Sequence, residues 1–243
     1  MKHAIIKFDS IDSTSTYIKN NYKSLEDGSV VTSITQTSGR GRLGRDWIDD
    51  GSSLLFSFLL KGNEYFSLLD SVSLLSGVAM ELAVLELGIE AKIKWPNDIY
   101  IGSKKVCGIL SEGISTDKLE CIVVGIGLNL NNKKFEKGLN ATSIYLETNK
   151  EFDRFAILDS FLKHLDNLLL EEKKSPYAYT KFIQSHDYLK DKDIYLNYYG
   201  ENLFLHCLGV DSKGALLGLS PNGELITITS GEASEVTSKA RII

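Results

Sequence analysis

Hydrophobic and polar positions along the chain follow two alternating patterns, one with the period of a β-strand and one with the period of an α-helix. Short alternating or fully apolar runs, bounded by Gly, Asn and Asp, predict strands at residues 4–8, 30–36, 54–60, 89–94, 99–101, 106–112 and 121–130. Apolar positions that recur every three or four residues predict helices at 16–22, 66–87, 152–169 and 179–186. Residues 12–14 supply an N-cap for the first of these helices, and Gly88 ends the second.

The pattern changes beyond residue 189, which predicts a second domain. Four short strands are expected at 194–199, 203–210, 215–219 and 225–228, separated by Gly-containing turns at 211–214 and 221–223. Such a run of strands is typical of a small antiparallel barrel. We therefore expect an α+β domain at residues 1–188, followed by a small β domain at residues 189–243.

Composition and charge narrow the class of protein. With 43% hydrophobic and 24% charged residues, the chain has the composition of an ordinary globular protein. Its apolar runs are far shorter than the ~20 residues that a bilayer requires, and its N-terminus lacks a signal-peptide core, so a cytoplasmic location is expected. A net charge of −5 provides no general attraction to phosphate backbones, which argues against nucleic acid as a partner.

Cysteine and histidine offer little chemistry. Cys107, Cys121 and Cys207 are isolated in the sequence, and the four His residues are equally scattered. Neither a zinc site, a disulfide framework nor a His-dependent triad is indicated. The chemistry is therefore sought among Lys, Arg, Asp and Asn.

A glycine- and arginine-rich segment at residues 36–47 is the most informative stretch. Its glycines at positions 39, 41 and 44 match a dinucleotide-binding pattern, but the polar residues at 48–53 cannot continue the helix that such a site requires. What remains is a flexible loop that carries Arg40, Arg42 and Arg45 and that suits a phosphate-bearing ligand. A solvated basic turn is the alternative.

Two further segments could place charge beside the same ligand. Residues 94–98, Lys-Trp-Pro-Asn-Asp, connect two predicted strands, and Lys104 and Lys105 introduce the next one. A Lys at a strand end can meet a phosphate, and an Asp in a turn can orient a basic side chain. Both segments also suit ordinary solvated turns.

The segment at residues 125–131 combines Gly with Asn. Gly125 and Gly127 leave one face of a strand bare, so a flat ring can lie against the backbone, and Asn129 can pair with an adenine edge. A glycine bulge with structural Asn turns is an equally good interpretation.

Together and in this order, residues 12–14, 36–45, 94–98, 105–110 and 125–129 resemble the biotin–protein ligase (biotin–[acetyl-CoA-carboxylase] ligase) family. The resemblance is dense over residues 9–131 and returns at 209–216 and 231–234. It implies a class II aminoacyl-tRNA synthetase-like catalytic domain, a mixed sheet flanked by helices, with a small C-terminal SH3-like β-barrel. It also implies that biotin and ATP form biotinyl-5′-AMP, from which biotin passes to a lysine of a biotin carboxyl carrier protein domain.

The resemblance also implies roles for individual residues. The expected catalytic groups are Lys105, Arg40 and Arg42. Biotin contacts are expected from Ser13, Thr14, Ser15, Gln36, Gly39, Arg40, Gly41, Arg42 and Lys105. Contacts with ATP or the adenylate are expected from Arg42, Arg45, Trp47, Lys94, Asn97, Asp98 and Asn129. Mg²⁺ arrives with ATP, so neither a dedicated metal site nor a tightly bound prosthetic group is expected, and a homodimer is compatible with the resemblance.

Two departures from the family pattern qualify these expectations. Many members have Asn where this chain has Ser15, which implies a weaker or water-mediated contact with the ureido ring. Only 11 residues precede Asp12, too few for the winged-helix domain of regulatory members, so a short-form ligase without DNA binding or repressor activity is expected. The alternatives are a lipoate–protein ligase or octanoyltransferase, and a non-catalytic biotin-binding homologue.

Overall fold

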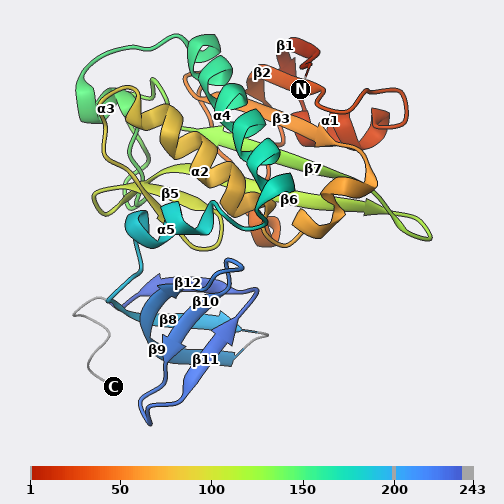
Figure 1. The fold of residues 1–243 in the computed structure, drawn as a ribbon. Helices are drawn as coiled ribbons and strands as arrows, with labels where there is room; N and C mark the ends of the chain where they lie inside the picture. Colours follow the sequence, from red (N-terminus) through yellow and green to blue (C-terminus); the bar gives the residue numbers. More distant parts are fainter. Residues whose placement is uncertain (1, 199–200, 237–243) are drawn as a thin grey trace.

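The computed structural model describes residues 2–198 and 201–236, and a seven-stranded mixed sheet forms its larger part (Figure 1). In sheet order the strands are β1 (Ile5–Ile11), β2 (Val30–Gln36), β3 (Leu54–Leu60), β7 (Leu119–Leu128), β6 (Lys104–Ser115), β5 (Asp98–Ile101) and β4 (Lys92–Lys94). Strands β1 and β2 run parallel, and the other neighbouring strands pair antiparallel. All seven residues of β3 are buried, because this strand lies inside the sheet with both faces covered.

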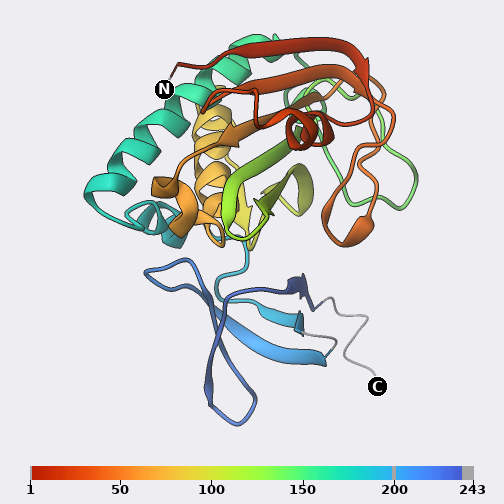
Figure 2. The ribbon, with the colours of Figure 1, turned by 90° about the vertical axis from the view of Figure 1, so that its right-hand side faces the viewer.

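Helices cover both faces of this sheet. On one face, α2 (Val72–Leu85) and α4 (Arg154–Lys174) pack against each other (Figure 1), and Phe161 of α4 meets Phe56 and Phe58 of β3 with ring centroids 5.0 and 5.9 Å away. On the other face lies α1 (Thr14–Asn21) (Figure 2). Its Ile18 packs with Val31 and Leu59. No helix in the described part of the chain is both long and apolar enough to cross a membrane.

The prediction of a single helix at residues 66–87 is wrong. The chain instead forms a 3₁₀ helix, η2 (Asn63–Leu68), and then α2. The apolar residues have helical spacing over the whole segment, but the helix itself is interrupted at Asp70 and Ser71. There the Ser71 amide donates to Leu68 O at 2.9 Å in a turn. The short α3 (Ile144–Thr148) was not predicted, because five residues are too few to show a helical period. The other predicted elements of this part are confirmed, β2 and β3 with the predicted ends and the rest with shifted ends.

The C-terminal part forms an antiparallel sheet after the predicted helix α5 (Thr180–His186). Its order is β11 (Leu225–Ile228), β10 (Leu216–Leu219), β9 (Glu201–Val210), β8 (Asp193–Tyr198) and β12 (Glu232–Glu235). The α+β class is confirmed, but β11 and β12 do not pair within the described residues, so the predicted barrel is not closed there. Strand β12 was not predicted. Of the predicted strand 194–199, Tyr199 lies outside the described residues, as do residues 237–243 of the predicted domain.

The connection between the two sheets passes across the open side of β4. Asp187 bridges to Ile93, and the Tyr188 amide donates to Ile93 O at 2.9 Å. Trp95 donates from Nε1 to Gly214 O at 3.1 Å, which ties the turn before β5 to the C-terminal sheet. The predicted boundary between residues 188 and 189 falls in this connection, and we propose it as the division of the chain.

Glu81 is an exception inside the apolar core. It lies on α2 with 0% exposure, and neither carboxylate oxygen has a hydrogen-bond partner among the described residues. Burial raises the pKa of Glu81 from 4.5 to about 8, and the positive charge of Lys92 only partly opposes this shift. A carboxyl of this kind is therefore held protonated at neutral pH.

Glu81→Gln should stabilise the protein at high pH and leave it unchanged near pH 4. Below pH 4.5 the Glu81 carboxyl is protonated in both the folded and the unfolded protein. Between pH 4.5 and about 8 it loses its proton only in the unfolded protein, so the wild type becomes less stable as the pH rises. The difference in unfolding free energy should reach a few kcal/mol above pH 8. Urea unfolding of both proteins at pH 5, 7 and 9 measures it, and parallel pH profiles would contradict this assignment.

Candidate active site

A polar patch forms where α1 begins against the sheet. The Thr14 amide donates to Gln36 Oε1 at 2.7 Å, and Ser57 Oγ lies 2.7 Å from Thr14 Oγ1 and 2.8 Å from Ser15 Oγ. Ser13 caps the helix by accepting from the Thr16 amide at 3.4 Å. These hydroxyls are buried, yet each has a partner, which is the condition for keeping polar groups inside a protein. They form a rigid array of donors and acceptors.

Alternate residues of β7 extend from this polar patch. Gly125 lies directly opposite Ser57 of β3, and an added Cβ at Gly125 would come within 2.5 Å of Ser15 Oγ. Gly127 lies beneath Trp47, where an added Cβ would meet Cε2 at 2.5 Å. Because side chains alternate along a strand, Gly125, Gly127 and Asn129 share one face. Side chains are therefore missing from this face at two positions, as the sequence predicted.

The glycine- and arginine-rich segment folds back on itself beside this bare face. The Gly41 amide donates to Arg45 O at 2.7 Å, and the Trp47 amide donates to Gly39 O at 2.9 Å. These bonds bring Trp47 over β7, with its ring 5.6 Å from Lys105 Nζ. Arg42 turns toward the next motif and donates from Nη1 to Asn97 Oδ1 at 3.0 Å.

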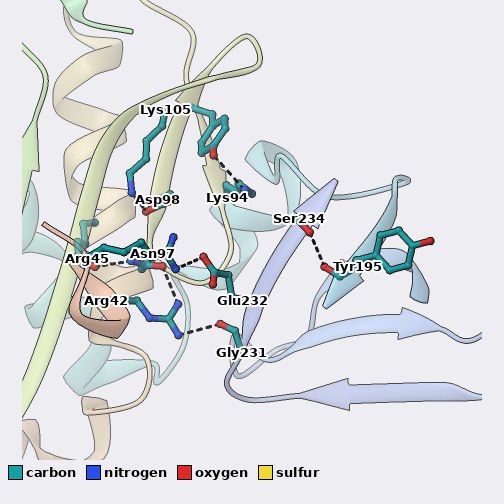
Figure 3. Close-up of polar contacts among 12 residues, drawn as sticks. Arg42, Arg45, Lys94, Asn97, Asp98, Lys105, Tyr195, Gly231, Glu232 and Ser234 are labelled. Carbon is teal, nitrogen blue, oxygen red and sulfur yellow. Dashed lines mark hydrogen bonds and ion pairs between the residues drawn. The ribbon is translucent and has the colours of Figure 1, made fainter. Parts of the chain in front are cut away.

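Charged side chains of the turn at residues 94–98 and of the start of β6 lie together: Lys94, Asp98 and Lys105 (Figure 3). Lys105 Nζ lies 2.7 Å from Asp98 Oδ1, and Asn97 donates from Nδ2 to Ile109 O at 2.7 Å, which fixes the turn against β6. Burial lowers the pKa of Lys94, while nearby carboxylates, Asp98 first, oppose the shift. Lys104 is exposed, so the structure distinguishes the two lysines: Lys105 is the one that lines the site.

These groups surround one cavity of about 680 Å³, a size typical of a small-molecule site. It collects almost every residue singled out from the sequence: Ser13, Thr14, Ser15, Gln36, Arg40, Gly41, Arg42, Arg45, Trp47, Lys94, Asn97, Asp98, Lys105 and Asn129. Gly39 does not line it; an added Cβ there would meet Trp47 O at 2.9 Å, so this glycine lets the loop fold back. The described residues contain no group of three or more His, Cys, Asp or Glu placed to hold a metal ion.

Sequence reasoning missed several lining residues. Ser57 is the one hydroxyl in the apolar strand β3, and that interruption was a usable signal. Phe135 and Leu139 come from the segment between β7 and α3, which carries no motif. Glu232 and Ala233 reach the cavity from β12 of the C-terminal sheet, and only the tertiary structure brings them there.

The fold and this cavity are those of a protein that binds an elongated, anionic small molecule, and comparison with known proteins identifies the family. The chain belongs to the Biotin/lipoate A/B protein ligase family, whose model matches residues 7–129. This confirms the family resemblance of the sequence motifs.

Individual relatives narrow the comparison. The chain is 29% identical over 231 residues to the bifunctional ligase/repressor BirA of Bacillus subtilis, covering 91% of this chain and 67% of the relative. It is 30% identical to the Salmonella typhimurium protein of the same name, covering 92% and 72%. The biotin protein ligase of Aquifex aeolicus, solved with biotin and ATP, superposes with a TM-score of 0.86 at 32% identity, covering 96% of this chain and 99% of that one. The chain is a homologue of biotin–protein ligases.

Proposed function

We propose that this protein is an ATP-dependent biotin–protein ligase that forms biotinyl-5′-AMP and transfers biotin to a lysine of a biotin carboxyl carrier protein domain. The observation that carries the proposal is the face of β7 that lacks side chains at Gly125 and Gly127. This face runs from Gly125, which lies beside the hydroxyls of the polar patch, past Gly127 and Trp47 to Asn129. The charged turn at residues 94–98 also borders the cavity. Four residues of strand span about 13 Å, enough for a ligand with a polar ring at one end and a nucleotide at the other.

The polar patch suits the ureido ring of biotin. A cyclic urea presents one acceptor and two donors, and hydroxyls can serve as either. Ser13, Thr14, Ser15 and Gln36 are proposed as contacts, together with the backbone of the loop at Gly41. Ser15 stands where the family resemblance leads one to expect Asn, and its hydrogen bond to Ser57 holds the shorter side chain in place.

The cations suit the first half-reaction. A carboxylate oxygen of biotin attacks the α-phosphorus of MgATP, the bond to the β-phosphate breaks, and pyrophosphate leaves. Negative groups approach one another in this step, so positive side chains lower the barrier by neutralisation and positioning. Lys105, held by Asp98, is proposed to contact the carboxylate and the α-phosphate, assisted by Arg40 and Arg42.

The remaining groups are proposed to hold the nucleotide. Arg45 and Lys94 provide positive charge, Asn97 and Asp98 keep the basic side chains in place, and Trp47 and Asn129 contact the adenine or the adenylate. In the second half-reaction the acceptor amine attacks the carbonyl carbon of the anhydride and AMP leaves. A cytoplasmic location, which would keep the three buried free cysteines reduced, is part of the proposal.

Biotin-dependent release of pyrophosphate from ATP tests this function. We expect release with biotin and none with lipoate, since every relative reported above is a biotin ligase or a BirA. Release with lipoate would favour the lipoate ligase alternative. Tight biotin binding without pyrophosphate release would identify a non-catalytic homologue.

Lys105→Ala should slow adenylate formation about a hundredfold, because it removes one positioned cation from the transition state. Lys104→Ala is the matched control, since this neighbour is exposed and outside the cavity. Single-turnover pyrophosphate release measures both variants, and circular dichroism verifies that both fold. A normal rate for Lys105→Ala with a slow Lys104→Ala would reverse the assignment.

Arg42→Gly should release preformed biotinyl-AMP faster than the wild type. The variant loses a guanidinium proposed to face the adenylate, and it also loses the bonds to Asn97 and Gly231 that hold the loop. Free adenylate would then biotinylate stray lysines of unrelated proteins. Stopped-flow measurement of the off-rate checks the prediction, with Leu43→Gly, an exposed loop neighbour, as the control. Equal off-rates for Arg42→Gly and the wild type would refute the proposed retention role.

A further inference from the structure

The turn before β12 brings the C-terminal sheet to the mouth of the cavity. Glu232 and Ala233 are lining residues, although they lie far along the chain from every motif of the catalytic domain. Figure 3 shows the side chain of Glu232 directed at the arginine loop and the carbonyl of Gly231 beside it. The C-terminal sheet therefore contributes an acidic group to a site whose proposed ligand is anionic.

Two arginines of the loop bind this turn. Arg45 forms an ion pair with Glu232 through Nη2 and Oε1. Arg42 donates from Nη2 to Gly231 O at 3.0 Å while its Nη1 donates to Asn97 Oδ1 at 3.0 Å (Figure 3). Arg42 thus links the turn at residues 94–98 with the turn before β12.

Glu232 is also close enough to a second cation, Lys94, to stabilise its charge. The charge of Lys94 is stabilised by three carboxylates, those of Asp98, Glu232 and Glu235, and opposed by the positive charge of Arg45. Glu232 therefore lies among positive groups from two separate motifs. A phosphate group would seek the same surroundings, because guanidinium groups bind carboxylate and phosphate with the same geometry.

We propose that Glu232 is an internal competitor of the nucleotide: its carboxylate and the nucleotide phosphates bind the Arg45 guanidinium in turn. This inference rests on the proposed function, in which Arg45 contacts ATP. Nucleotide binding then separates β12 from the loop, and separation of β12 favours nucleotide binding, because such coupling is reciprocal. Glu232 is a positioning residue: it acts through Arg45 and does not touch the reacting atoms.

The ion pair is weak enough to be exchanged. The side chains of Arg45 and Glu232 are 59% and 42% exposed, and pairs this exposed contribute little to stability. Removing the competing carboxylate should therefore tighten nucleotide binding only about two- to fivefold. A group that merely supported the fold would, on removal, weaken binding.

Glu232→Gln keeps the shape of the side chain and removes its charge, so it tests the competition directly. Calorimetric titration with ATP, and separately with inorganic triphosphate, should show tighter binding by Glu232→Gln than by the wild type. Glu224→Gln is the matched control, since it removes one negative charge from an exposed turn of the same sheet, and its affinity should equal that of the wild type.

Hydrogen exchange provides a readout of the coupling. In the wild type, ATP should speed exchange in the segment 225–236; in Glu232→Gln that segment should exchange faster from the start and change little with ATP. Unchanged or weaker ATP binding by Glu232→Gln, or no response of the segment in the wild type, would overturn the competition. In that case biotin-dependent pyrophosphate release would still be observed, whereas a wild type that binds neither ATP nor triphosphate would overturn the proposed function as well.

Discussion

The site depends on one packing constraint: two alternate positions of β7 have no side chain. An added Cβ at Gly125 or Gly127 would meet Ser15 or Trp47 at 2.5 Å, closer than two such atoms approach in proteins. The opposite face of the same strand carries Val124 and Ile126, which are buried in the main core. One face of β7 therefore packs in the core, and the other, without side chains at two positions, borders the cavity. Because the strand is held by the core, it gives the site a rigid wall.

The sequence predicted the fold where local pattern and tertiary environment agree. Strand β3 is apolar at every position except Ser57 because it is buried on both faces, and α4 shows a clear helical period because it has one buried side. The pattern failed where apolar spacing continued through a turn, as at Asp70 and Ser71 before α2. It also failed for β12, a strand of four residues with a single buried side chain, which exists because β8 is there to pair with it.

The candidate site follows the same rule. The arginine loop was indicated in advance by its composition, because three arginines alternating with glycines are unusual in an acidic protein. The Pro-Asn-Asp turn and the Lys104–Lys105 pair suit ordinary turns when taken alone, and only their combination with the other motifs indicated a site. Ser57 and Glu232 gave weaker signals, since each matters through a partner distant in sequence: Ser57 through Thr14 and Ser15, and Glu232 through Arg45. Such long-range contacts are fixed by topology, which the local pattern does not contain.

Electrostatic repulsion explains why the positive side chains of the cavity have carboxylate partners. Several positive groups around one pocket repel one another. Burial also disfavours the charged form of a lysine, and it lowers the pKa of Lys94. Asp98 beside Lys105 and Glu232 beside Arg45 offset this repulsion, one from within the catalytic domain and one from the C-terminal sheet. The two carboxylates differ in exposure: the Asp98 side chain is the more buried of the two, whereas the Glu232 side chain is more exposed. Under the proposed competition, an anion that enters this cavity meets one cation paired with a largely buried carboxylate and another whose present partner, Glu232, it replaces.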